Sequence, residues 1–226
     1  MKLLAVDTAL GACSAVILDD EMVRGHAFEP MQRGHAERIA PMVQDVMLSS
    51  GLNLDAVDRL AVTVGPGTFT GQRVGYAFMR GLKLALGRPL IGITTLAAMA
   101  EAAMAQTGTG AAAVLHDARR DEVYLTLVTK AKTLSGDRLV SIAEAVDTIL
   151  EFDNDLTEGL AMAGTASRHA AEILLSRGCK PVLSDIVAPD ALWVARVAMS
   201  ATEPETTPRP LYLRPPDARL PASPPR

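Results

Sequence analysis

Apolar positions recur with two different periods along this chain, and the two periods predict a mixture of strands and helices. Short apolar runs bounded by turn residues predict strands at 2–7, 13–18, 22–29, 60–64, 89–92, 112–117, 122–129 and 159–163. Longer segments with apolar residues every three or four positions predict helices at 35–50, 71–86, 94–105, 142–151, 167–177 and 189–201. The first three strands are joined by short turns, so we expect an antiparallel meander at the start. Because Pro41 lies inside the first predicted helix, either that helix begins just before Pro41 or its first turn is kinked.

Residue composition divides the chain into three parts. The stretch Gln106–Gly110 is rich in glycine and threonine, and it separates two groups of strand and helix signals. The segment from Glu203 to Arg226 contains eight prolines, which favours an extended or partly disordered chain, and Pro210–Arg214 is the portion expected to pack. We therefore expect an N-terminal lobe at 1–106, a C-terminal lobe at 107–202 and a proline-rich tail at 203–226.

The predicted helix at 71–86 has more apolar surface than one core requires. Its polar side chains gather on one side and leave an apolar arc of roughly 220°, whereas a helix lying on one core needs about 100°. These polar residues are Gln72, Arg73, Tyr76, Arg80 and Lys83. A helix with such an arc is buried on two sides. The second cover is either the neighbouring helix at 35–50 or a second protein chain.

A strand that ends in Gly65-Pro66-Gly67 leads directly into this helix. Glycine permits positive φ and close backbone approach, and proline stiffens the turn. A strand, a tight turn and a helix N-terminus together aim backbone N–H groups toward one point, which suits an anion or the tight docking of a partner backbone. The segment has neither the Gly-Lys-Ser/Thr of a Walker sequence nor the spacing of a dinucleotide fingerprint.

Asp7-Thr8 at the end of the first strand, with Gly11 in the following turn, resembles the phosphate-facing hairpin of actin- and sugar-kinase-type folds. The alternative interpretation is that Asp7 caps a turn. Asp7, Thr8, Gly65 and Gly67 are therefore weak candidates for binding a cofactor.

Charge, cysteines and histidines narrow the classes of function. A formal net charge of −4 carries no electrostatic signature of a free-standing nucleic-acid binder. Cys13 and Cys179 are too few for a disulfide framework or a zinc cluster, and no two of the four histidines have the i, i+4 spacing of a metal-binding helix. We therefore expect no metal site and no catalytic residue. No apolar segment is long enough to span a bilayer and the N-terminus lacks a cleavage-site pattern, so we expect a soluble, cytoplasmic protein.

One predicted hairpin is strongly charged. Asp117-Ala118-Arg119-Arg120-Asp121-Glu122 joins the strands at 112–117 and 122–129. A charged turn is usually just solvated. Two adjacent arginines that face a cleft between lobes bind an anion or a partner carboxylate instead. Asp117, Arg119 and Arg120 are therefore candidates for a cleft site.

Several blocks of sequence occur in one order over nearly the whole chain. They are Ala5-Val6-Asp7-Thr8 with Cys13-Ser14, Arg33-Gly34-His35-Ala36-Glu37 with Pro41-Met42, Gly65-Pro66-Gly67-Thr68-Phe69-Thr70-Gly71, Pro89-Leu90-Ile91-Gly92-Ile93-Thr94-Thr95-Leu96, Asp117-Ala118-Arg119-Arg120-Asp121-Glu122-Val123-Tyr124 and Pro210-Leu211-Tyr212-Leu213-Arg214. This series closely resembles the bacterial TsaB (YeaZ) proteins. The third and fifth blocks are the most specific. Gln72 departs from the family, which usually carries an apolar residue there.

The resemblance implies an α/β, two-lobed, actin-like ATPase (ASKHA, ribonuclease H-like) fold. It also implies a non-catalytic scaffold subunit in the synthesis of N6-threonylcarbamoyladenosine in tRNA. In that role the chain pairs with the catalytic subunit TsaD, and the pair recruits the ATPase TsaE. The resemblance also implies that the chain contacts tRNA as part of the complex. It implies that this subunit alone binds no cofactor and that the complex uses ATP. The sequence leaves open whether the free protein is a monomer or a homodimer, and an exposed apolar patch would favour a homodimer through the same surface.

The resemblance places the pairing surface on the helices at 35–50 and 71–86. The residues expected to contact a partner are His35, Ile39, Met42, Val46, Gly71, Gly75, Met79, Leu82 and Leu86. The catalytic relative has a metal-binding His-x-x-x-His where this chain has Thr95 and Met99, which implies that the metal chemistry is lost. Two alternatives from other classes are an ATP-binding enzyme of the same fold, with Asp7 and the glycine turn on phosphates, and a glycoprotease-like metallopeptidase.

Overall fold

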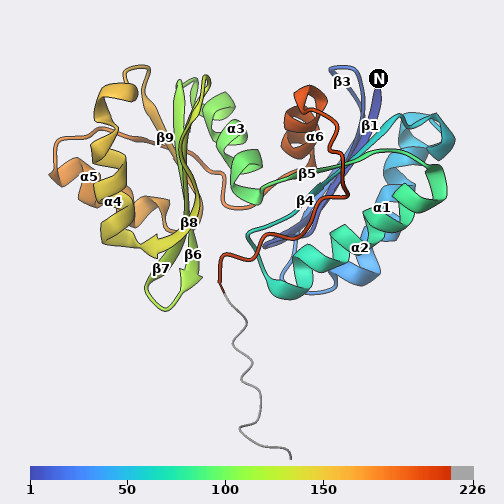
Figure 1. Cartoon of the computed structure of the whole chain (residues 1–226), viewed down its shortest axis with the longest axis horizontal. Helices are drawn as coiled ribbons and strands as arrows, with labels where there is room; N and C mark the ends of the chain where they lie inside the picture. Colours follow the sequence, from blue (N-terminus) through green and yellow to red (C-terminus); the bar gives the residue numbers. More distant parts are fainter. Residues whose placement is uncertain (215–226) are drawn as a thin grey trace, which may run out of the picture.

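Two five-stranded sheets of matching topology organise the molecule (Figure 1). The computed structural model describes residues 1–214. The first sheet contains β1 (Lys2–Asp7), β2 (Ala12–Asp19), β3 (Met22–Pro30), β4 (Arg59–Thr63) and β5 (Leu90–Ile93) in the order β3-β2-β1-β4-β5. The second contains β6 (Ala111–Arg119), β7 (Glu122–Thr129), β8 (Thr133–Ser141), β9 (Leu160–Ala163) and β10 (Val182–Leu183) in the order β10-β9-β6-β7-β8.

Each sheet begins with an antiparallel meander and continues with two parallel strands. In the first sheet β1 pairs antiparallel with β2 and parallel with β4, and in the second β6 pairs antiparallel with β7 and parallel with β9. The predicted meander of three strands at the start is therefore confirmed. The two lobes repeat one topology although their sequences share no obvious repeat, which confirms the two-lobed α/β fold.

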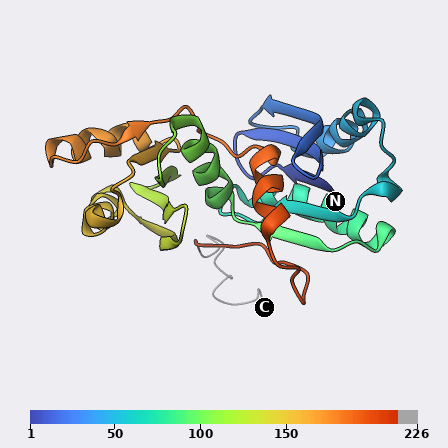
Figure 2. The same ribbon diagram turned by 90° about the horizontal axis from the view of Figure 1, so that it is seen from above.

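The helices cover the sheets on both faces (Figure 2). They are α1 (His35–Ser50), α2 (Phe69–Leu86), α3 (Thr95–Thr107), α4 (Ile142–Glu151), α5 (Ser167–Ser176) and α6 (Ala191–Ser200). Helices α1 and α2 pack on one face of the first sheet and α6 packs on the other. Helices α4 and α5 cover the outer face of the second sheet, while α3 fills the space between its inner face and the first lobe.

The structure confirms every predicted helix and strand to within two residues at each end. It adds β8, β10 and two short 3₁₀ turns at Leu54–Ala56 and Asp153–Asp155, none of which was predicted. Strand β8 was not predicted because Gly136 and Asp137 interrupt the alternation of apolar and polar residues in its sequence. Helix α1 runs through Pro41, so the alternative in which the helix begins just before Pro41 is wrong.

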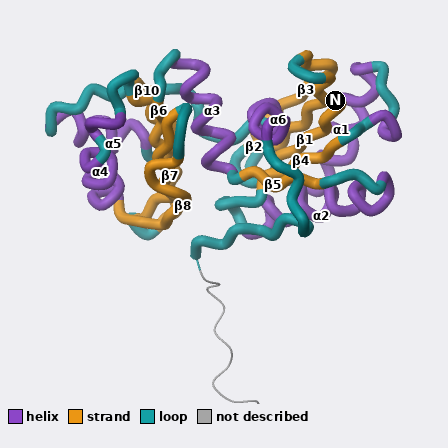
Figure 3. Tube along the Cα trace, turned by 45° about the horizontal axis from the view of Figure 1, so that its top comes forward, coloured by secondary structure: helices purple, strands orange, loops and turns teal. Residues whose placement is uncertain are grey.

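Helix α6 belongs to the first sheet, although its residues were expected within the C-terminal lobe at 107–202. Ala191, Val194, Ala195 and Ala198 are fully buried on this sheet, because small side chains let the helix lie close to it. The chain thus returns from the second lobe to cover the first (Figure 3). The tail expected at 203–226 is described only as far as Arg214, and the remainder lies outside the described residues.

Polar contacts fix the start of α6 on the first sheet. The Asp190 carboxylate caps the helix by accepting from the backbone N–H of Leu192 at 2.9 Å. The same oxygen lies 2.8 Å from Nε2 of His26 on β3, and the Ala191 N–H donates to Ser14 Oγ at 2.8 Å. The hydrogen bond to Asp190 raises the pKa of His26 above its ordinary value, although partial burial opposes it.

Three glycines let the first hairpin dock against the Gly-Pro turn and α2. A Cβ at Gly67 would lie 2.5 Å from the Ala9 carbonyl oxygen, and one at Gly75 would lie 2.6 Å from Thr8 Oγ1. A Cβ at Gly71 would meet the Thr8 carbonyl oxygen. The Thr8 hydroxyl donates to the Gly71 carbonyl at 2.7 Å and accepts from the Gly75 N–H at 2.9 Å. A methyl group at any of these positions would force the hairpin away from the helix.

No helix within residues 1–214 is both long enough and apolar enough to cross a membrane.

We predict that Gly75→Ala destabilises the protein by about 1–3 kcal/mol, because Thr8 is buried and hydrogen-bonded and cannot move aside. The matched control is Gly81→Ala on the same helix, where a Cβ would meet nothing within 4 Å. There the loss of glycine should add about 0.5–1 kcal/mol of stability. Chemical denaturation measures both. Equal stabilities of the two variants would show that the hairpin does not need this close approach.

We predict that His26→Gln removes a pH-dependent part of the stability. Because the folded-state pKa of His26 is raised, its contribution is fully present below the unfolded pKa of about 6.5 and is lost as pH rises through the folded value. The difference in stability between wild type and variant should therefore shrink as pH rises from 5 to 8. The control is His169→Gln, since His169 is exposed and its nearest carboxylate oxygen, on Glu172, is 3.9 Å away. A difference that is constant with pH would contradict the assigned His26–Asp190 contact.

Candidate functional site

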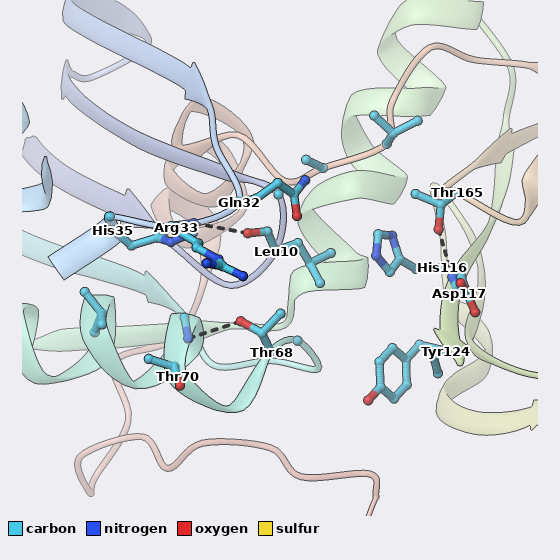
Figure 4. Close-up of a pocket in the computed structure, with 18 of the residues that line it drawn as sticks. Leu10, Gln32, Arg33, His35, Thr68, Thr70, His116, Asp117, Tyr124 and Thr165 are labelled. Atoms are coloured by element: carbon cyan, nitrogen blue, oxygen red, sulfur yellow. Dashed lines mark hydrogen bonds between the residues drawn. The ribbon is translucent and has the colours of Figure 1, made fainter. Parts of the chain in front are cut away.

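A cleft of about 900 Å³ lies between the two lobes (Figure 4). Leu10, Gln32 and Arg33 line it from the first lobe, and His116 and Tyr124 face them from the second. Helices α1 and α2 both begin at this cleft, with His35 and Thr68 at its wall. The two helices therefore run away from the cleft side by side, in the same general direction.

The cleft wall carries charges of both signs. Arg33 and Glu37 come from the first lobe, and Asp117 and Arg119 come from the charged hairpin of the second. A wall of mixed charge has no strong preference for one kind of ion. The structure thus places Asp117 and Arg119 on the cleft, as the sequence led us to expect, while Arg120 lies at the hairpin tip outside the cleft lining.

The hairpin tip holds three successive non-glycine residues in the left-handed region. Arg119, Arg120 and Asp121 have φ values of 64°, 58° and 60°. Asp117 supports this backbone by accepting from the Arg119 N–H at 2.7 Å, and the Asp117 N–H donates to Thr165 Oγ1 at 2.9 Å. Such a conformation costs free energy and persists only where its surroundings hold it.

His116 is a cleft residue that sequence reasoning missed. It is half-buried, its Nδ1 has no hydrogen-bond partner among the described residues, and burial lowers its pKa to about 4. The ring is therefore neutral at physiological pH. The signal that could have found His116 is its position directly before the family block that starts at Asp117. Arg33 and Tyr124, which also line the cleft, lie inside their own blocks.

The Gly-Pro turn uses its backbone groups within the chain. The Thr68 N–H donates to the Ala9 carbonyl at 2.9 Å, and the Gly71 N–H donates to the Thr68 hydroxyl at 3.1 Å. The Gly65 carbonyl accepts from the Thr95 N–H at 2.8 Å. The backbone that docks against this turn is therefore the chain's own first hairpin, a use that the sequence did not indicate. Among the weak cofactor candidates, only Gly67 lines the cleft.

Asp7 is sealed inside the first lobe. Its Oδ1 accepts from Thr63 Oγ1 at 2.5 Å and from the Ala9 N–H at 3.1 Å, while its Oδ2 has no partner among the described residues. Complete burial raises the pKa of Asp7 to about 7, and the hydrogen bonds from Thr63 and Ala9 limit the rise. Asp7 and Thr8 are both fully buried, so in this conformation they hold chain segments together rather than face the cleft.

The structure corrects which residues of α1 and α2 are free to contact a partner. Among the nine expected, Ile39, Met42, Val46 and Met79 are at most 2% exposed and form the core under the two helices. Gly71 and Gly75 are buried against Thr8, and His35 lies at the cleft, where Nε2 is 3.2 Å from the Leu10 carbonyl oxygen. Leu82 and Leu86 are half-buried. The apolar arc of α2 is thus covered on its inner side by the chain itself.

The exposed positions of these helices are different ones. They are Ala36, Glu37, Ala40, Pro41, Gln44, Asp45, Leu48 and Ser49 on α1, and Phe69, Thr70, Arg73, Ala77, Arg80, Gly81, Leu84 and Ala85 on α2. Two large apolar side chains stand out among them, since Leu48 is 80% exposed and Leu84 is 77% exposed. We name these sixteen positions the outer helical face.

Thr95 and Met99 lie one turn apart at the start of α3, and both are fully buried. Met99 packs into the core between α3 and the second sheet. Within residues 1–214, no three His, Cys, Asp or Glu side chains are grouped so as to hold a metal ion.

The sequence was also compared with known proteins. Residues 24–191 match the family described as TsaD: tRNA N6-adenosine threonylcarbamoyltransferase. The tRNA threonylcarbamoyladenosine biosynthesis protein TsaB of Haemophilus influenzae is 35% identical over 240 aligned positions, covering 95% of this chain and 94% of that protein. The TsaB protein of Escherichia coli K12 is 44% identical over 124 residues, which cover 55% of this chain and 53% of that protein.

Solved structures agree with the sequence relatives. YeaZ from Pseudomonas aeruginosa superposes with a TM-score of 0.76 at 29% identity, covering 94% of this chain and 99% of that one. A ROK hexokinase from Thermus thermophilus shares the fold alone, with a TM-score of 0.55 at 13% identity over 87% of this chain and 98% of the other. The fold is therefore the actin-like one that the sequence blocks implied. With a close full-length relative named TsaB and a YeaZ structure that matches nearly end to end, this chain belongs to the TsaB (YeaZ) family.

Proposed function

We propose that this protein is a non-catalytic scaffold subunit of the complex that makes N6-threonylcarbamoyladenosine in tRNA, and that it binds the catalytic subunit TsaD through the outer helical face. Membership of a family that includes tRNA threonylcarbamoyladenosine biosynthesis proteins supports the pathway. The observation that carries the binding role is the exposed surface of α1 and α2, on which Leu48 and Leu84 are 80% and 77% exposed.

The composition of this face suits helix-on-helix contact with another chain. Ala36, Ala40, Ala77 and Ala85 are exposed small residues, and a Cβ at Gly81 would meet nothing within 4 Å. Small side chains let a partner helix approach closely, and two exposed leucines, Leu48 and Leu84, provide apolar area that is removed from water on binding. Since α1 and α2 run in the same direction, the partner would meet two roughly parallel helices. A second copy of this chain offers the same face, which favours a homodimer when the partner is missing.

The interior of the protein supports a scaffold role rather than a catalytic one. By the resemblance to the catalytic relative, Thr95 and Met99 correspond to two of its histidine ligands, and a buried thioether and hydroxyl are poor ligands for a metal of that kind. Asp7 is committed to Thr63 and the hairpin. The side chains most suited to chemistry are thus used to hold the lobe together, so we propose that ATP and the carbamoyl donor are handled by other subunits.

We propose that tRNA and TsaE associate with this chain only after it has bound TsaD. A net charge of −4 gives this chain no strong electrostatic attraction for tRNA, so the assembled complex would bind the tRNA. We propose that the pair of this chain with TsaD is also what the ATPase TsaE recognises, since the paired surface exists only after assembly.

We predict that Leu84→Asp and Leu48→Asp each weaken binding to TsaD of the same organism by at least about tenfold, because a charge replaces an apolar contact at a surface that becomes dry. Isothermal titration calorimetry measures the affinity. The matched control is Leu175→Asp, which places the same charge on an exposed leucine of α5 in the other lobe. All three variants should keep wild-type thermal stability, because in the free chain Leu48 is 80% exposed, Leu84 77% and Leu175 55%.

The outcomes separate the parts of the proposal. If wild-type protein fails to bind TsaD at micromolar concentration, the scaffold role is wrong. Should binding survive Leu84→Asp and Leu48→Asp yet fall with Leu175→Asp, the role stands and the assigned surface is wrong. Reconstituted tRNA modification, read by nucleoside mass spectrometry, should follow the affinities, with no product from this chain alone.

A further inference from the structure

The segment after α6 crosses from the first lobe to the second. It passes over β5 and the start of α2 and ends beside the β6–β7 hairpin (Figure 1). We name residues 208–214 the strap. Residues 210–214 of this segment form the last of the six family blocks, and neither the cleft nor the outer helical face accounts for it.

The strap is fastened to the first lobe at three points. Tyr76 Oη donates to the Pro208 carbonyl at 2.7 Å, and the Leu211 N–H donates to the Val64 carbonyl at 2.6 Å. Arg73 Nε donates to Tyr212 Oη at 2.7 Å. The Arg73 guanidinium also stands 3.5 Å above the ring centre of Phe69, and the Phe69 and Tyr212 rings are 6.0 Å apart. These contacts hold an extended segment that has no helix or sheet of its own.

The first lobe leaves room for the strap by means of two glycines. A Cβ at Gly92 would lie 2.6 Å from Pro208 Cβ, and one at Gly65 would lie 2.7 Å from the Leu211 carbonyl oxygen. Gly65 also has a φ of 105°, which other residues rarely adopt. The strap path is therefore built into the Gly-Pro turn itself and does not merely lie on the surface.

Within residues 1–214, the Arg214 side chain joins the strap to the second lobe. Arg214 Nη2 donates to Glu122 Oε2 at 2.5 Å and to the Arg119 carbonyl at 3.3 Å. The Arg214 and Glu122 side chains are 20% and 39% exposed, so this ion pair is partly shielded from water. Because Arg119 is one of the three left-handed residues at the hairpin tip, Arg214 supports backbone that needs external support.

The hairpin held by Arg214 forms part of the cleft wall. Asp117 and Arg119 line the cleft opposite Arg33, while the strap lies against the turn that carries Gly67 on the first-lobe side. A contact that ties the hairpin to a segment fixed on the first lobe limits how far the two walls can separate. The connection through α3 lies elsewhere, in the core between the lobes.

We propose that the strap is a latch between the lobes, with Arg214 as its second-lobe contact, and that it sets both the conformation of the 117–122 hairpin and the width of the cleft. The latch is closed in this structure. Loss of the Arg214 contact frees the hairpin and lets the lobes separate, while the strap remains fastened to the first lobe.

The test uses hydrogen exchange of the full-length protein, read by mass spectrometry in peptides that cover residues 117–122. Arg214→Ala should speed exchange there by about three- to tenfold, because a charge-assisted hydrogen bond and a backbone contact are lost together. Glu122→Gln should give a smaller increase in the same direction, since the neutral amide keeps the shape and weakens the pair. The matched control is Arg209→Ala, because Arg209 is an exposed strap arginine with no hydrogen bond or ion pair within the described residues.

A distance measurement tests the effect on the cleft. Spin labels at Leu48→Cys and Leu175→Cys, in a Cys179→Ser background, report the separation of the lobes from two exposed positions. Arg214→Ala should broaden the distance distribution relative to Arg209→Ala. If Arg214→Ala does not fold, Glu122→Gln carries the test in both measurements. Hairpin exchange and lobe distances indistinguishable from those of Arg209→Ala would overturn the latch.

Discussion

The Thr8 hydroxyl is inserted between Gly71 and Gly75, and much of the first lobe depends on this contact. It donates to the carbonyl of one glycine and accepts from the N–H of the other, which are the two ends of a single i to i−4 step of α2. Neither residue could carry a Cβ without pushing the hairpin away. Through this contact the end of β1 fixes where α2 begins, and α2 in turn completes the core beneath α1 and provides part of the outer helical face.

The same contact explains why the polar residues at the end of β1 do not face the cleft. A turn rich in glycine and helix N-terminal N–H groups is suited to holding an anion. Here the Ala9 carbonyl takes the Thr68 N–H, and Asp7 is buried against Thr63 with its pKa raised to about 7. In this chain these backbone and carboxylate groups are engaged in the internal packing of the first lobe.

Two returns of the chain join the lobes. Helix α6 comes back from the second lobe to cover the first sheet, where Asp190 meets His26 and Ser14 supports the helix start. The strap then leaves α6, crosses the first lobe and reaches the second-lobe hairpin through Arg214. The geometry of the cleft therefore depends on the last described residues of the chain as well as on its core.

The sequence by itself determined the family of this protein and its described elements, apart from β8, β10 and the two 3₁₀ turns. Hydrophobic periodicity located α1 and α2 because each must bury one face, and the Gly-Pro-Gly block marked a close backbone approach because only glycine permits one. Only the tertiary structure shows which segment docks against the Gly-Pro-Gly turn. It also decides which side of α2 is covered. The apolar arc of α2 predicted burial on two sides, but in the free chain Met79 lies in the core while Leu84 is 77% exposed, because periodicity gives the width of an apolar surface and not what covers it. Likewise β8 and the place of α6 depend on pairing and packing between residues far apart in sequence, which no local pattern records.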